Sequence, residues 1–134
     1  HDGSSAVSSI DQYSFASDNQ GVSYTTMTAT SFYFCGHSSS THGYSSGGDY
    51  STGTNIIERF SFSSTAASSD HGDLSVSRYG CAGNSSITHG YSSGGASSSG
   101  DRNTIDKFSF ASNTTASNIG NISVARKYGS GLHY

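Results

Sequence analysis

Apolar and polar residues alternate over several short segments of the chain. Over residues 56–62 one predicted face carries Ile56, Glu58, Phe60 and Phe62, and the other carries Ile57, Arg59 and Ser61. Leu74 and Val76 alternate in the same way. A period of two is typical of β-strands, because successive side chains of a strand point to opposite faces. The pattern therefore predicts an all-β protein of short strands.

Internal repetition is the strongest signal in the sequence. The octapeptide THGYSSGG occupies residues 41–48 and recurs unchanged at 88–95, 47 residues later. The segment 57–62 returns as 105–110, and a related form stands at 10–15. Recurrence at a fixed period indicates a repeat architecture.

A further block, at 72–78, matches 120–126. We therefore interpret the chain as a single repeat domain, 1–134, of nearly three repeats of 47–48 residues. Its copies are placed at about 1–40 (partial), 41–87 and 88–134. Each repeat is predicted to hold four short strands, which is the spacing of a β-propeller blade.

The order of residues within a repeat resembles the kelch family. The matching positions are Arg78, Tyr79-Gly80, Tyr91, Gly94-Gly95, Phe108-Ser109-Phe110 and Arg126. The resemblance covers almost the whole chain, but the tryptophan that kelch blades usually carry is missing. It implies propeller blades with a binding or structural role.

The amino-acid sequence of the repeats is also similar to that of Ser/Gly-rich repeat proteins of marine cyanobacterial phages. The similarity is carried by THGYSSGG and by the segment NTIDKFSFAS at 103–112. It implies a role in a virus particle.

The number of repeats has a consequence for assembly. Propellers have ~4–8 blades, so three blades do not close a ring. An open stack leaves unpaired strand edges, which promote association. We therefore expect the ring to be completed by homo-oligomerisation or by a longer chain.

Composition excludes several classes of protein. Ser, Thr and Gly make up almost half of the chain, which disfavours long helices. The formal net charge of −3 offers no basic field to nucleic acid. The sequence has no apolar run of the length that crosses a membrane, so no membrane partner is expected.

Three carboxylates hold the same place in the three repeats, namely Asp11, Glu58 and Asp106. Paired carboxylates can perform acid/base chemistry, as in glycosidases. However, a position repeated in every blade is more often structural. We expect ion pairs with Arg78 and Arg126, and a different arrangement in the first copy, where Ser31 replaces the arginine.

Histidines and cysteines give no metal signature. His42 and His89 are equivalent in THGY, and His37 lies five residues before His42, but none of these spacings fits zinc. We expect the THGY histidines to form hydrogen bonds within each blade and predict no metal or cofactor. Cys35 and Cys81 are one position out of register, so we expect two buried thiols rather than a disulfide.

The sequence contains no nucleophile elbow, and we expect no catalytic residues and no enzyme activity. Phe60, Phe62, Phe108, Phe110, Leu74, Val76 and Ile122 are predicted to form the core. Tyrosine provides contact area at low entropic cost, so Tyr44, Tyr50 and Tyr91 are candidates for a ligand surface.

The resulting hypothesis is a structural or adhesive component of a virus particle, located in the virion or outside cells. Its expected partners are further copies of the chain, other virion proteins and surface glycans. The alternative is a carbohydrate-binding propeller module of a secreted bacterial protein. An enzyme using its carboxylates is the third possibility, and the similarity of the repeats disfavours it.

Overall fold

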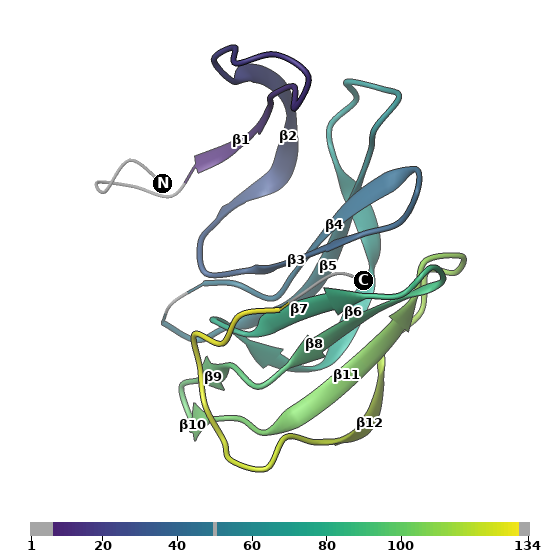
Figure 1. The fold of residues 1–134 in the computed structure, drawn as a ribbon. Helices are drawn as coiled ribbons and strands as arrows, with labels where there is room; N and C mark the ends of the chain where they lie inside the picture. The colour runs from purple at the N-terminus through teal and green to yellow at the C-terminus, as the bar shows by residue number, and fades with distance from the viewer. Residues whose placement is uncertain (1–6, 50, 132–134) are drawn as a thin grey trace.

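The computed structural model describes residues 7–49 and 51–131, and this part of the chain is all-β. Its strands are β1 (Val7–Gln12), β2 (Val22–Ser31), β3 (Cys35–Ser38), β4 (His42–Ser46), β5 (Thr54–Ser61), β6 (Ser69–Arg78), β7 (Ala82–Ser85), β8 (His89–Ser93), β9 (Ala96–Ser97), β10 (Gly100–Asp101), β11 (Thr104–Ser109) and β12 (Ser117–Asn121). Figure 1 shows these strands in chain order. Within the described ranges no helix is long and apolar enough to cross a membrane.

The later two repeats each build a four-stranded antiparallel sheet. The second forms the order β3-β4-β5-β6, and the third forms β7-β8-β11-β12. Repeats are counted by these sheets from here on, so the second begins with β3 at Cys35 and the third with β7 at Ala82, ahead of the approximate sequence bounds at 41 and 88. The third repeat also carries the small hairpin β9-β10. The first repeat is described as the hairpin β1-β2 alone, whose strands correspond by sequence to the last two strands of a complete sheet. The four strands per unit that the repeat predicts are present in both later units.

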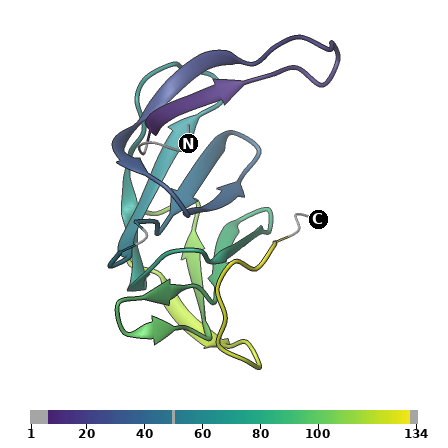
Figure 2. The same cartoon turned by 90° about the vertical axis from the view of Figure 1, so that its left-hand side faces the viewer.

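The hairpin and the two sheets are arranged in chain order. Figures 1 and 2 show the hairpin at one end, the sheet β3-β6 in the middle and the third repeat at the other end. Strand β2 contacts β5, β3 contacts β7, and β6 contacts β11 and β12. Across residues 7–49 and 51–131 the sheets do not close into a ring.

The main hydrophobic core lies between the second and third repeats. It consists of Tyr44, Ile57, Leu74, Phe108 and Ala116, with the partly buried Phe110 packed against it. Leu74 and Phe108, which the sequence placed in the core, are 1% and 2% exposed.

The other predicted core residues are less enclosed. Phe60, Phe110, Val76 and Ile122 are only half-buried. Phe62 is 46% exposed, so its assignment to the core is wrong. The reason is that Phe62 belongs to the second repeat, and the aromatic strand of a repeat is buried by the repeat before it. Here that repeat is described as a two-stranded hairpin.

Burial along β5 does not follow the predicted alternation of two faces. Ile56, on the predicted face of Phe60, is 45% exposed, whereas Ile57 on the other face is fully buried. The pairing of β5 with β6 shifts register on both sides of Ile56, which breaks strict alternation. In addition, the middle sheet is covered on both faces. Ile57 meets the third repeat, while Glu58 meets the first.

A backbone ladder joins equivalent positions of the three repeats. Gly80 N–H donates to Tyr33 O at 2.6 Å, and Tyr128 N–H donates to Gly80 O at 2.6 Å. The three residues are 47 and 48 positions apart and have φ of 61°, 62° and 59°. Each repeat therefore places a residue in the left-handed region at the same point, which glycine adopts most easily. The shared geometry keeps successive repeats in one orientation.

Gly90 shows how closely strand and aromatic ring approach in the core. It pairs with Phe108 across β8 and β11, and a Cβ atom at Gly90 would overlap the Phe108 ring. We expect Gly90→Ala to lower the free energy of unfolding by about 1–3 kcal/mol, because the ring must leave its position. Urea denaturation measures the loss.

Gly36→Ala is the matched control for this substitution. Gly36 lies in β3, and a Cβ atom there meets nothing within 4 Å. The free energy of unfolding of the Gly36→Ala variant should stay within about 0.5 kcal/mol of the wild-type value. Equal losses in the two variants would contradict the packing argument.

Candidate functional site

The most enclosed polar contact joins the second repeat to the third. Arg78 ends β6, and Asp106 lies in β11. Arg78 Nη2 is 2.8 Å from Asp106 Oδ2, and both side chains are 0% exposed. The structure thus brings together two of the residues that the sequence proposed as ion-pair partners.

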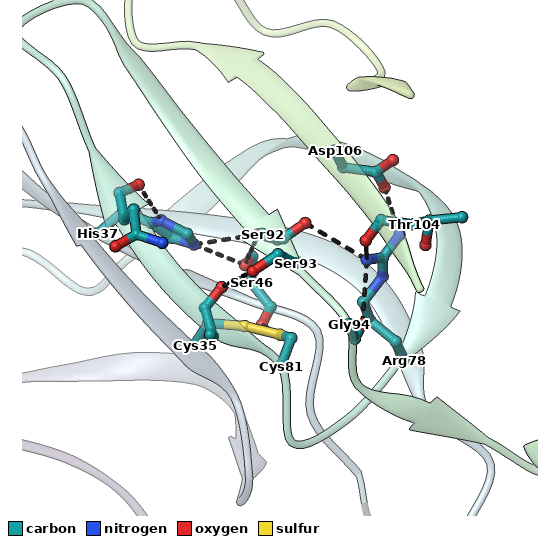
Figure 3. The surroundings of a disulfide bond; sticks show 12 residues. Cys35, His37, Ser46, Arg78, Cys81, Ser92, Ser93, Gly94, Thr104 and Asp106 are labelled. Atoms are coloured by element: carbon teal, nitrogen blue, oxygen red, sulfur yellow. Dashed lines mark hydrogen bonds and ion pairs between the residues drawn. A yellow bond between two sulfur atoms is a disulfide. The ribbon is translucent and has the colours of Figure 1, made fainter. Parts of the chain in front are cut away.

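The second guanidinium nitrogen of Arg78 holds the backbone of the third repeat. Nη1 donates to the carbonyl oxygens of Ser92, Gly94 and Thr104 at 3.4, 3.2 and 3.1 Å (Figure 3). Burial lowers the pKa of Arg78, and the charge of Asp106 opposes this effect. Because an arginine stays protonated in proteins, Arg78 is a permanent buried cation.

Ser75 completes the surroundings of the Asp106 carboxylate. Its N–H donates to Oδ2 at 2.8 Å, and its hydroxyl donates to Oδ1 at 2.6 Å. Ser75 and Arg78 are both on β6, three residues apart. One strand of the second repeat therefore supplies three donors to a single carboxylate of the third. Together, Ser75, Arg78 and Asp106 are called the carboxylate clamp below.

The contact between the first and second repeats uses the equivalent carboxylate without an arginine. Thr28 donates its N–H and its hydroxyl to Glu58 Oε1, and Ser68 donates to Oε2 at 3.2 Å. Ser31 stands 47 residues before Arg78, and its buried hydroxyl has no hydrogen-bond partner among the described residues. Glu58 is 6% exposed, so this carboxylate is also enclosed.

The remaining members of the predicted ion-pair set are exposed at the two ends of the described chain. Asp11, at the first repeat, makes no ion pair with another described residue. Arg126 is exposed and donates its Nε–H to Val124 O at 3.2 Å. Among the described residues the structure does not bring Asp11 and Arg126 to any partner of opposite charge.

Cys35 and Cys81 form a disulfide, so the expectation of two buried thiols is wrong. Their Cα atoms are 5.7 Å apart, and the bond links the second and third repeats. The register argument failed because Cys81 lies before the start of β7, where strict alternation does not apply. Moreover, β3 and β7 belong to different sheets that contact each other, so their register gives no rule for this pair.

His37 lies beside the disulfide and connects the same two repeats (Figure 3). Its Nδ1–H donates to Asn84 O at 3.1 Å, which leaves Nε2 to accept from the hydroxyls of Ser46 and Ser92 at 2.8 and 3.2 Å. Burial lowers the pKa of His37 to about 4, and the bond to Asn84 O partly opposes the shift. The ring is therefore neutral at pH 7.

The THGY histidines form the local hydrogen bonds expected of them. The Nδ1 atoms of His42 and His89 are each 2.8 Å from the hydroxyl of the preceding threonine. Within the part of the chain that the structure describes, no group of three His, Cys, Asp or Glu side chains is placed to hold a metal ion.

The candidate ligand tyrosines do not form a common surface. Tyr44 is 3% exposed and stacks on Phe110 with ring centroids 4.5 Å apart, so its assignment to a ligand surface is wrong. The prediction rested on the contact area that a tyrosine offers, and a buried ring offers the same area; here the third repeat covers the ring with Phe108 and Phe110. Tyr91 is half-buried in β8. Tyr50 lies outside the described residues.

Sequence reasoning missed the polar donors that complete the carboxylate contacts. Thr28 and Ser75 are 47 residues apart, and each donates its N–H and hydroxyl to the carboxylate of the following repeat. The repeat spacing contained this signal. However, serine and threonine are so frequent here that no single one stood out.

Comparison with known proteins assigns no family. No protein-family model matches the chain, and no curated protein sequence is significantly similar to it.

The carboxylate clamp should be tested at Arg78. Arg78→Met leaves Asp106 charged and buried, so we expect the free energy of unfolding to fall by about 3–5 kcal/mol. Arg126→Met removes the equivalent but exposed arginine. This substitution should change the free energy of unfolding by no more than about 0.5 kcal/mol. Chemical denaturation at low protein concentration measures both, and equal effects would contradict the distinction.

His37 predicts a specific dependence of stability on pH. Unfolded His37 takes up its proton near its ordinary pKa of 6.5, whereas the folded protein resists protonation down to about 4. The unfolded state therefore binds more protons in this window, and stability falls as the pH drops. From pH 7 to pH 4 this residue should remove about 3 kcal/mol.

His37→Gln isolates the contribution of this residue. The glutamine amide can still donate to Asn84 O but does not titrate. Urea denaturation of both proteins from pH 7 to pH 4 should show a weaker loss in the variant. Parallel pH profiles would show that burial of His37 is not the cause.

Proposed function

We propose that the chain is a non-enzymatic structural component of a virus particle, built from propeller-type blades. The observation that carries the proposal is that the polar residues recurring in each repeat form the contacts between repeats. In the two contacts between the described repeats, the repeated carboxylates Glu58 and Asp106 accept hydrogen bonds from the preceding repeat. Recurrence of these residues is thus accounted for by assembly of the repeats rather than by chemistry on a substrate.

The assignment to propeller blades rests on the form of the repeats. Each complete repeat is a four-stranded antiparallel sheet, and the first strands of neighbouring sheets, β3 and β7, lie in contact. Blades around a central channel have the same arrangement. The resemblance to kelch repeats supports the same assignment.

The absence of catalysis is supported by the state of the three carboxylates. Acid/base work requires carboxylates that reach a substrate. Glu58 and Asp106 are engaged and buried, which leaves Asp11 as the exposed member of the set.

The proposed location in a virion or outside cells rests on two observations. Disulfides persist mainly in oxidising environments, which favours a protein exposed outside the cytosol. The similarity of THGYSSGG and its flanking blocks to repeat proteins of marine cyanobacterial phages favours a particle.

A carbohydrate-binding module is the second candidate, because one open groove is aromatic. The groove, of about 310 Å³, lies between the hairpin β1-β2 and β5 and includes Tyr13, Phe15, Tyr24, Phe60 and Phe62. Aromatic rings of this kind can stack on sugar rings. A glycan array with the purified chain tests this candidate, and Phe15→Ala should abolish any binding that uses the groove.

Mass spectrometry of purified particles tests the principal proposal. Particles of a virus that carries this gene should contain the chain in a fixed ratio to the capsid protein through a density gradient. Recovery only from the soluble fraction of the lysate would overturn the assignment to a particle. Glycan binding together with that result would favour the second candidate.

A further inference from the structure

The two ends of the described chain carry the counterparts of residues that join the second repeat to the third. At the first repeat these are Asp11, Tyr13 and Phe15, which we call the acidic face. At the third repeat they are Ile122, Ser123 and Arg126, which we call the arginine face. In the buried contact between the second and third repeats, the equivalent residues of both faces meet each other.

The acidic face repeats the buried side of that contact. Asp11 and Tyr13 each lie 95 residues before their counterparts, Asp106 and Phe108. Asp106 is 0% and Phe108 is 2% exposed, whereas Asp11 is exposed and Tyr13 is 62% exposed. Phe15 is 94% exposed. Aromatic rings so exposed, beside a carboxylate that has no ion pair with any described residue, mark an interaction surface.

The arginine face repeats the opposite side of the same contact. Ser123 and Arg126 follow Ser75 and Arg78 by 48 residues, with the same spacing of three between them. Arg126 is exposed, whereas Arg78 is fully buried. Ser123 is exposed, as Ser75 is beside Asp106.

The strand before this face is also shorter than its counterpart in the second repeat. Strand β6 continues through Arg78, whereas its counterpart β12 ends at Asn121. Ile122, the counterpart of Leu74, is half-buried, and with Ser123 and Arg126 it lines an open groove of about 410 Å³.

The two faces complement each other in charge, in hydrogen-bonding groups and in apolar surface. One offers a carboxylate and aromatic rings, and the other offers an arginine, a serine and an apolar side chain. These are the components of the carboxylate clamp and of the core next to it.

We propose that the acidic face of one copy binds the arginine face of a second copy. Arg126 pairs with Asp11 of the other copy, Ser123 donates to the same carboxylate, and Ile122 packs on Tyr13. The contact is head-to-tail, so each copy retains one free face after a single contact, and two copies that use both contacts form a closed dimer. This inference concerns self-association and does not depend on a location in a virus particle.

Charge reversal tests the pairing in the intact chain. The wild type should form dimers in sedimentation equilibrium. Asp11→Arg and Arg126→Asp should each weaken dimerisation by about 100-fold or more, because each places like charges in both contacts. Asp18→Arg makes the same charge change at an exposed loop residue and should leave dimerisation unchanged.

Mixing the two charge-reversed variants separates loss of pairing from loss of folding. In a mixed dimer, the two substituted side chains would meet as an ion pair of reversed polarity at one contact, and the native Asp11 and Arg126 would meet at the other. An equimolar mixture should therefore dimerise, although neither variant does so alone. If a reversal unfolds the chain, as judged by circular dichroism, Asp11→Asn and Arg126→Gln replace it, and each should weaken dimerisation by about 10-fold or more.

Three results would overturn the proposal. The first is a wild type that stays monomeric at its highest soluble concentration, as expected if these faces bind other partners or other repeats of a longer chain. The second is self-association that neither substitution weakens. The third is failure of the mixture to dimerise when both variants are folded.

Discussion

The buried pair of Arg78 and Asp106 is the contact on which the arrangement of the second and third repeats depends. An ion pair removed from water gains little net stability, because desolvation offsets the attraction. Its effect is on specificity. With the pair in place, any other register of the two sheets leaves a charge buried without its partner. Arg78 also donates to three backbone carbonyls of the third repeat, at the end of β8 and the start of β11. It therefore fixes these strand ends as well as the Asp106 carboxylate.

The contact between the first and second repeats has the same geometry and different chemistry. Tyr24 and His71 are equivalent residues of different type, and each donates to a backbone carbonyl of the next repeat, at Ser61 and Ser109. Glu58 accepts hydrogen bonds from the Ser68 hydroxyl and from Thr28 of the first repeat, and no arginine among the described residues pairs with it. Positions that face a neighbouring repeat are thus constrained in hydrogen-bonding role more than in residue identity.

The sequence was sufficient for features that depend on local pattern and on the repeat. It predicted strands, four of them per unit, and it led to Arg78 and Asp106 as partners. It failed where the outcome depends on how sheets stack. The disulfide between Cys35 and Cys81, the burial of Tyr44 and the exposure of Phe62 are all decided by which face a neighbouring repeat covers. Alternation within one strand carries no information about that neighbour.

The disulfide, His37 and the carboxylate clamp act at different points of one contact. The disulfide links the start of β3 to the residue before β7, and His37 reaches hydroxyls of β4 and β8 from the same edge. The clamp holds the end of β6 to β11. A hinge between the two sheets would have to break either a covalent bond or a buried charge pair. These contacts therefore hold the second and third repeats in one orientation, which fixes the position of the arginine face relative to the second repeat.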